Sequence, residues 1–154
     1  MKISSNKLKD IIDFAYQELE SLYGKDEIRS MIYSIIEHFT SYNLMKILTY
    51  KDELKVSESE LLKINFAIKD LKKERPLQQI LGYCEFLDVR IEVNQHVLIP
   101  RVETEEIVQR VIKENKGRKN LKIADVCCGS GCIAIELKKA FPDANIYAYD
   151  ISEE

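Results

Sequence analysis

The residues Asp125-Val126-Cys127-Cys128-Gly129-Ser130-Gly131-Cys132 decide the fold of the carboxyl-terminal part of this chain. They continue an apolar segment that begins at Ile123, which predicts a strand. The two glycines predict a tight turn because glycine takes positive φ without strain. A helix that begins after this turn would direct its first N–H groups at whatever lies against the turn. The stretch therefore predicts a strand, a glycine turn and a helix, which together can cradle a ligand.

A second apolar segment, residues 145–149, ends in Asp150, nineteen residues beyond Gly131. In strand–helix–strand units of this kind, an acidic residue at about this distance accepts hydrogen bonds from ribose hydroxyls. We therefore expect a ligand that contains a ribose. The expected cofactor-binding residues are Cys127, Cys128, Gly129, Ser130, Gly131, Asp125 and Asp150.

Two cofactor classes use this geometry, and the glycine pair alone does not separate them. Ala134 completes a Gly-x-Gly-x-x-Ala pattern that a dinucleotide would accept. Asp125 ends the first strand, where its carboxylate would repel a pyrophosphate and attract an ammonium or a sulfonium group. S-adenosylmethionine carries both of these cations. The sequence therefore favours S-adenosylmethionine over a dinucleotide.

Two upstream stretches narrow the interpretation. They read Arg75-Pro76-Leu77-Gln78-Gln79-Ile80-Leu81-Gly82 and Val97-Leu98-Ile99-Pro100-Arg101-Val102-Glu103-Thr104-Glu105. Together with the glycine turn and Asp150-Ile151-Ser152, these motifs resemble the peptide chain release factor glutamine N5-methyltransferases, the HemK/PrmC family. The resemblance implies methyl transfer from S-adenosylmethionine to a glutamine side-chain amide. The glutamine lies in the Gly-Gly-Gln loop of translation release factors, which would be the protein partners.

The resemblance also implies roles for the second of these stretches. In the family this segment lies beside the cofactor, so we expect a structural role near the cofactor and no catalytic one. The residues concerned are Pro100, Arg101, Glu103, Thr104 and Glu105. The amino-terminal helices of the family dock the partner protein, and the same is expected here.

The chain departs from the family pattern in three ways. Val102 stands where proline is usual, and Cys127-Cys128 stand where Gly-Thr is frequent. Both changes keep small or apolar residues, although Val102 lacks the fixed φ that proline gives to the start of a helix. The family's catalytic Asn-Pro-Pro-Tyr loop, which holds the target amide, is missing from the 154 residues. We therefore expect the amino-terminal part of such an enzyme, with no catalytic residue of its own and no activity by itself.

The first 75 residues predict helices. Apolar residues recur at helical spacing over residues 8–22, 28–39 and 44–48. Gly24 is expected to end the first helix as a left-handed residue. Ser57 and Glu60 form a capping-box pattern at the start of a fourth helix, which Pro76 should stop.

The following residues predict strands and one more helix. Val89, Ile91 and Val93 alternate with polar residues, which predicts a strand with one solvated face. A turn over residues 94–96 should lead into a second strand over 97–99 and complete a β-hairpin. A helix is expected over residues 103–114. Its residues expected to face the sheet are Ile107, Val108, Val111 and Ile112.

These elements predict an α/β fold in three parts. Residues 1–75 are expected to form a helical bundle, for which the resemblance implies a docking role, and residues 76–101 to form the β-hairpin linker. The resemblance implies that residues 102–154 are the start of a Rossmann-like class I S-adenosylmethionine-dependent methyltransferase domain, truncated after its second strand.

Charge and composition limit the partners. The chain carries 23 Lys and Arg against 26 Asp and Glu, and its net charge is −3. Lys72-Lys73-Glu74-Arg75 is the one basic run that we recognise, and a helix carboxyl end accounts for it. Nucleic-acid binding needs clustered cations, so we expect no direct nucleic-acid partner. No apolar run approaches the ~18 residues of a membrane span, so we expect no membrane contact and a cytoplasmic location.

The cysteines do not predict a metal site. Cys84, Cys127, Cys128 and Cys132 contain no Cys-x-x-Cys pair, and both histidines are distant in sequence. Zinc sites need closer paired ligands.

Two other functions remain open from the residues. The helical part could be a stand-alone module that binds a protein, with a vestigial strand–helix segment. The chain could also come from a nucleic-acid amino methyltransferase, which shares the Asn-Pro-Pro-Tyr chemistry but should carry a basic face.

Overall fold

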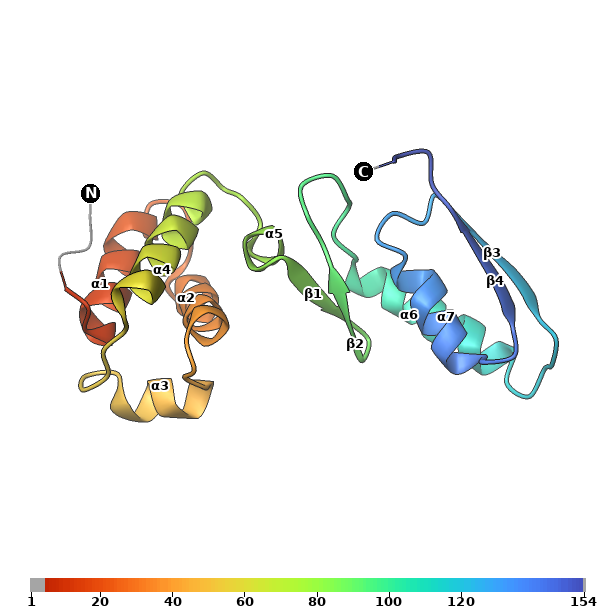
Figure 1. Cartoon of the computed structure of the whole chain (residues 1–154), viewed down its shortest axis with the longest axis horizontal. Helices are drawn as coiled ribbons and strands as arrows, with labels where there is room; N and C mark the ends of the chain where they lie inside the picture. The colour runs from red at the N-terminus through yellow and green to blue at the C-terminus, as the bar shows by residue number, and fades with distance from the viewer. Residues whose placement is uncertain (1–4, 154) are drawn as a thin grey trace. The chain divides into compact units, whose positions relative to one another are not determined.

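The computed structural model describes residues 5–153. It divides into two compact units, Met1–Leu81 and Gly82–Glu154, which are described separately (Figure 1). Both helices and strands are present, in the order expected for a mixed α/β chain. None of the helices that the structure describes is long and apolar enough to cross a membrane.

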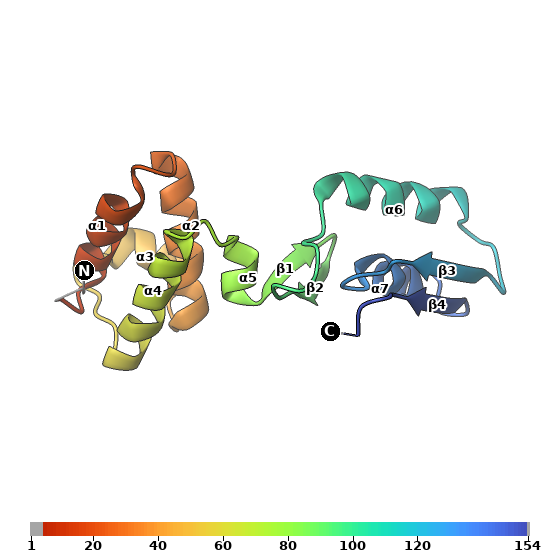
Figure 2. The same cartoon turned by 90° about the horizontal axis from the view of Figure 1, so that it is seen from above.

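Five helices make up the described part of the first unit. They are α1 (Leu8–Leu19), α2 (Lys25–Phe39), α3 (Leu44–Tyr50), α4 (Glu58–Leu71) and α5 (Leu77–Leu81). The helices α1, α2 and α4 pack against one another, and α3 packs against α2 (Figure 1 and Figure 2). Their apolar stripes share one core, in which Leu8, Ile32 and Ile64 are fully buried. Each such side chain contributes about 1.5–3 kcal/mol when it is removed from water.

The helix termini correct one prediction and confirm another. Gly24 was predicted to end the first helix in a left-handed conformation, but its φ is −69° and it forms the N-cap of α2. The prediction was wrong because α1 already ends at Leu19, and a short turn follows. The capping box is confirmed: the Ser57 side chain accepts from the Glu60 N–H, and the Glu60 carboxylate accepts from the Ser57 N–H. The Ser57 N–H and hydroxyl both donate to the Glu60 carboxylate, and these two bonds hold the pKa of Glu60 below its usual value.

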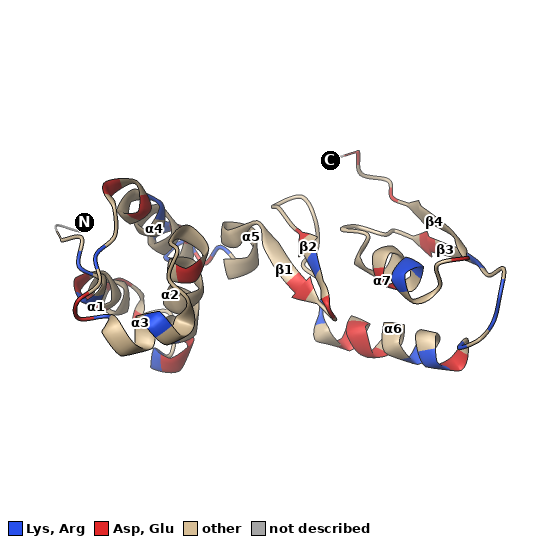
Figure 3. Cartoon of the chain, turned by 60° about the horizontal axis from the view of Figure 1, so that its bottom comes forward, with Lys and Arg blue, Asp and Glu red and all other residues tan. Residues whose placement is uncertain are grey.

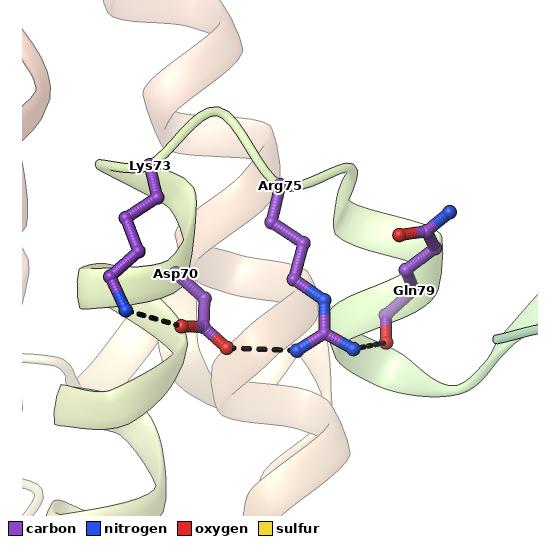
Figure 4. A network of polar contacts seen from close by, with 4 residues as sticks. All are labelled: Asp70, Lys73, Arg75 and Gln79. Atoms are coloured by element: carbon purple, nitrogen blue, oxygen red, sulfur yellow. Dashed lines mark hydrogen bonds and ion pairs between the residues drawn. The ribbon is translucent and has the colours of Figure 1, made fainter. Parts of the chain in front are cut away.

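The segment after α4 is fastened by a polar network (Figure 4). The Arg75 guanidinium lies 3.1 Å from an Asp70 carboxylate oxygen and donates to the Gln79 carbonyl oxygen at 3.3 Å. Lys73 pairs with the other Asp70 oxygen at 3.7 Å. This network ties the end of α4 to α5. The helical unit therefore extends to Leu81, while the predicted three-part division of the chain stays a prediction.

The second unit begins with a hairpin. Strand β1 (Tyr83–Phe86) pairs antiparallel with β2 (Val89–Glu92), and Phe86 is opposite Val89. The alternating strand is confirmed, but its predicted partner is wrong, since residues 97–99 form no strand. Leu87, with a φ of 54°, lies in the two-residue turn that joins β1 to β2. A turn this short matches the twist of paired strands, so the preceding segment becomes the partner.

A strand–helix–strand unit completes the chain. It follows α6 (Val102–Glu114) and consists of β3 (Lys122–Val126), α7 (Cys132–Ala140) and β4 (Asn145–Tyr149). The two strands are parallel, with Ile123 opposite Ile146. These two isoleucines pack in one core with residues of α6 and α7, whereas Tyr147 and Tyr149 are exposed.

Fewer residues of α6 pack against the sheet than the sequence predicted. Val108 is buried, and Val111 and Ile112 are partly buried in the core. Ile107 was also expected to face the sheet, but it is 63% exposed. Its position on the helix lies outside the stripe that Val108, Val111 and Ile112 form.

Candidate functional site

The turn after β3 is built from residues with positive φ. Gly129 has a φ of 52°, Gly131 a φ of 73° and Cys127 a φ of 64°. The Gly131 N–H donates to the Cys128 carbonyl at 2.8 Å, which closes the turn, and the Cys128 N–H donates to the Tyr149 carbonyl at 3.0 Å. The expected glycine turn between strand and helix is therefore present. It is fixed to the end of β4.

Asp150 lies at this turn, directly after β4. One carboxylate oxygen accepts from the Gly129 N–H at 2.7 Å, and the other accepts from the Ser152 N–H at 3.0 Å. The bonds from Ser152 and Gly129 hold the pKa of Asp150 below its usual value. Asp150 is therefore an exposed carboxylate that stays ionised near neutral pH. The structure places it beside the glycine turn, and its expected contact with ribose hydroxyls stays a prediction.

Asp125 is the next-to-last residue of β3 and is buried. Its side chain is 9% exposed, and one carboxylate oxygen accepts from the Ala134 N–H at 3.2 Å. Ala134 lies in the first turn of α7, whose N-cap, Gly131, has no side chain to offer. Asp125 therefore takes the place of a capping side chain and compensates the positive end of the helix dipole. Its expected attraction for a cationic ligand stays a prediction.

A cleft of about 590 Å³ opens beside the turn. It is lined by Cys127, Gly129, Ser130, Asp150 and Ser152 on one side and by Gly82, Glu92, Val93, Asn94, His96, Val97 and Leu98 on the other. Volumes of this size are typical of pockets for small molecules. The cleft lies where the two parallel strands end, the usual position of ligands in open α/β sheets.

The second wall of the cleft was not predicted. A Cβ added to Gly129 would lie 3.4 Å from a Val97 methyl group, so the turn and the segment after β2 are in close contact. His96 is positioned by its own backbone, since its N–H donates to the Asn94 side chain at 2.8 Å. The Asn-Gln-His run after a strand signalled a turn, but nothing local indicated that Val97, which follows this turn, lies against Gly129.

The residues that the resemblance placed beside the cofactor lie before and within the first turns of α6. Arg101 is the N-cap of α6, and Glu103, Thr104 and Glu105 form its first turns. Among the described residues that line the cleft, neither Pro100 nor any of these four occurs. Their cofactor-proximal role therefore stays a prediction.

A buried carboxyl lies further along α7. Glu136 is 4% exposed, and its Oε1 atom has no hydrogen-bond partner within the described residues. The Lys139 ammonium is 4.0 Å from this oxygen and also pairs with Asp88 in the turn of the hairpin. Burial raises the pKa of Glu136, and the charges of Asp88 and Glu105 raise it further, against the effect of Lys139.

The cysteines are free thiols. Burial raises the pKa values of Cys84 and Cys132, so both are protonated at neutral pH. Cys127 is exposed in the turn. Over residues 5–153, no group of three or more His, Cys, Asp or Glu is arranged to hold a metal ion.

Comparison with known proteins gives a consistent result. No protein-family model matches the chain. A release factor glutamine methyltransferase of Flavobacterium psychrophilum is 42% identical over 142 residues, 90% of this chain and 49% of that protein. Proteins of the same name are 37% identical over 144 residues in Bacteroides thetaiotaomicron and 33% identical over 150 residues in Streptococcus pneumoniae. The chain resembles the amino-terminal part of these enzymes.

The matches cover most of this chain but only part of each relative. The chain spans about half the length of the curated relatives it matches, with shares of 49%, 51% and 52%. The matches cover between 90% and 96% of the chain, so they include residues of both compact units. The likeness to release factor glutamine methyltransferases therefore reaches beyond the glycine turn and the linker motif.

Proposed function

We propose that this chain is the amino-terminal part of an enzyme that methylates a glutamine side-chain amide in the Gly-Gly-Gln loop of a translation release factor. The methyl donor is S-adenosylmethionine. The observation that carries the proposal is the glycine turn with the Asp150 carboxylate fixed beside it. It occurs in a chain that resembles release factor glutamine methyltransferases over at least 90% of its length.

The residues at the turn fit this cofactor. A carboxylate offers about four lone-pair sites, and Asp150 uses two of them on backbone N–H groups. The remaining sites accept hydrogen bonds from the ribose hydroxyls. Gly129 suits the turn because its φ of 52° is one that other residues rarely adopt, and its missing side chain leaves the backbone open to a ligand. Cys127, Cys128, Ser130 and Gly131 complete the cradle, and Asp125 lies beneath it with a negative charge that favours the cationic end of the ligand.

The chemistry divides between this chain and residues outside it. S-adenosylmethionine supplies an electrophilic methyl group on a sulfonium centre. An amide nitrogen is a poor nucleophile, so alignment and exclusion of water supply most of the catalysis. The residues of this chain hold the donor. The 154 residues contain no Asn-Pro-Pro-Tyr sequence to hold the amide, and we propose that they do not catalyse the transfer by themselves.

The remaining parts have supporting roles in this proposal. The second unit is the start of a Rossmann-like class I methyltransferase domain, which is supported by its parallel strands and by the exposed Tyr147 and Tyr149 on one sheet face. The helical unit docks the release factor, and the segment from Pro100 to Glu105 supports the cofactor. Release factors act on ribosomes, so the reaction belongs in the cytoplasm, without direct contact to nucleic acid or membrane.

The proposal is tested in the enzyme that contains this chain. Labelled S-adenosylmethionine and a purified release factor should give methylation at the Gly-Gly-Gln glutamine, and Asp150→Ala should weaken cofactor binding by about tenfold or more. The matched control is Asp143→Ala, which changes an exposed aspartate before β4. Unchanged cofactor affinity in the Asp150 variant would refute the ribose assignment, and transfer to a nucleic acid instead of the release factor would refute the substrate.

A further inference from the structure

The amino ends of β3 and β4 enclose a second hollow, of about 660 Å³. Its lining comes from the end of α6, the segment before β3 and the turn before β4. The apolar part of the lining includes Ile112, Leu121 and Phe141. The glycine turn and Asp150 follow the same strands, so this hollow lies at the opposite strand ends from the candidate cofactor cleft and shares no lining residue with it.

The rim of this hollow is strongly basic. Residues 113–122 carry five cations, Lys113, Lys116, Arg118, Lys119 and Lys122, against one anion, Glu114. Figure 3 shows them along the end of α6 and the segment that leads into β3. Glu114 is paired with Arg110 at 2.8 Å, and none of the five cations forms an ion pair with another described residue. The sequence prediction that Lys72–Arg75 is the one basic run is therefore wrong.

The helix dipole accounts for only part of this charge. Lys113 lies in the last turn of α6, where a cation is favourable, but the dipole effect fades within one turn. Arg118, Lys119 and Lys122 lie beyond that turn. Asp143 is the one acidic side chain among the described lining residues, which include four of the cations.

The walls of the hollow are held by hydrogen bonds. The Lys138 ammonium donates to the Pro142 and Ala144 carbonyls at 2.9 and 2.8 Å, which fixes the turn before β4. The Asn145 N–H donates to the Leu121 carbonyl at 2.8 Å and joins this turn to the segment before β3. The basic rim and the apolar floor are therefore kept together without a ligand.

We propose that this hollow docks an acidic protein segment that inserts one apolar side chain between the cations. The cations of the rim would attract the Asp and Glu side chains of the segment, and the apolar floor would bind the one apolar side chain that inserts. The floor argues against nucleic acid, because Phe141 is only 9% exposed and the described lining offers no aromatic face on which bases could stack.

Fluorescence anisotropy with the whole chain tests the proposal. The probe is a labelled peptide, Asp-Glu-Asp-Leu-Glu-Asp-Glu, and a second peptide has Ser in place of Leu. The double variant Arg118→Glu/Lys119→Glu should bind the first peptide about tenfold more weakly. The control Lys25→Glu/Lys63→Glu changes the net charge equally on exposed residues of the helical unit and should bind as the parent does.

Two further measurements separate docking from general charge attraction. The Ser peptide should bind the parent several-fold more weakly than the Leu peptide, and added salt should weaken both. Equal binding of the two peptides, or equal loss in both double variants, would overturn the proposal. Tighter binding of a short oligouridylate than of the Leu peptide would also overturn it, in favour of a nucleic-acid surface. Circular dichroism checks that the variants fold.

Discussion

Replacing Glu136 by glutamine should stabilise the second unit, and only above the pH at which the carboxyl ionises. Glu136 as a whole residue is 4% exposed, and its Oε1 atom lacks a hydrogen-bond partner among the described residues. Lys139 lies 4.0 Å away and is shared with Asp88, so its charge compensates Glu136 only in part. Glutamine keeps the shape of the side chain and removes the charge.

The sign of the effect follows from the raised pKa of Glu136. The pKa of the Glu136 carboxyl is higher in the folded protein than in the unfolded chain. Its contribution to the free energy of unfolding is therefore fully present below the unfolded-state pKa, where the carboxyl is neutral in both states. That contribution is lost as the pH rises through the folded-state pKa. A buried polar group without a hydrogen-bond partner costs about 1–3 kcal/mol, and this range sets the size of the expected effect. We expect Glu136→Gln to raise the free energy of unfolding by about 1–2 kcal/mol near pH 8 and to leave it unchanged near pH 4.

Urea unfolding at several pH values measures this effect. A hydrogen-exchange pulse at one fixed pH, read on peptides of α7, reports the unfolding of the second unit separately from the helical unit. The control is Glu106→Gln, an exposed residue of α6. A gain that does not change with pH, or a loss of stability at every pH, would show that Glu136 is not an incompletely compensated charge.

Three smaller predictions concern the turn and the helix caps. Cys127→Gly should relieve roughly 1–2 kcal/mol of strain from the left-handed backbone at this position and cost about 0.5–1 kcal/mol in chain entropy. The unfolding temperature should therefore rise slightly, and a clear fall would contradict this prediction. Ser57→Ala should lower the free energy of unfolding by about 1 kcal/mol and speed hydrogen exchange at the start of α4, because it removes the N-cap side chain. The control Ser21→Ala should change neither quantity. Asp125→Ala should lower the free energy of unfolding by about 1 kcal/mol and speed hydrogen exchange at the Ala134 N–H, and Asp125→Asn should lower it less. Equal exchange at Ala134 in the parent and both variants would refute the capping role of Asp125.

The sequence determined the elements whose signals are local. Apolar spacing placed the helices, and the capping box at Ser57 predicted a bond that forms between residues three positions apart. Glycine takes positive φ without strain, so the pair at 129 and 131 after an apolar segment allowed the turn to be predicted without its surroundings. The position of Asp150 beside the turn could be predicted because a strand–helix–strand unit has a nearly fixed length, whereas its role toward ribose stays a prediction.

Only the tertiary structure decided which distant segments meet. Val97 lies against Gly129, and the Asp125 carboxylate accepts from Ala134 rather than facing solvent. The basic rim acquired its apolar floor because the turn before β4 lies beside the segment before β3. Residue spacing fixes contacts within a helix, a hairpin or a tight turn, where the backbone allows few conformations. Contacts across long separations depend on how whole faces pack, and many packings satisfy the same local pattern until the core selects one.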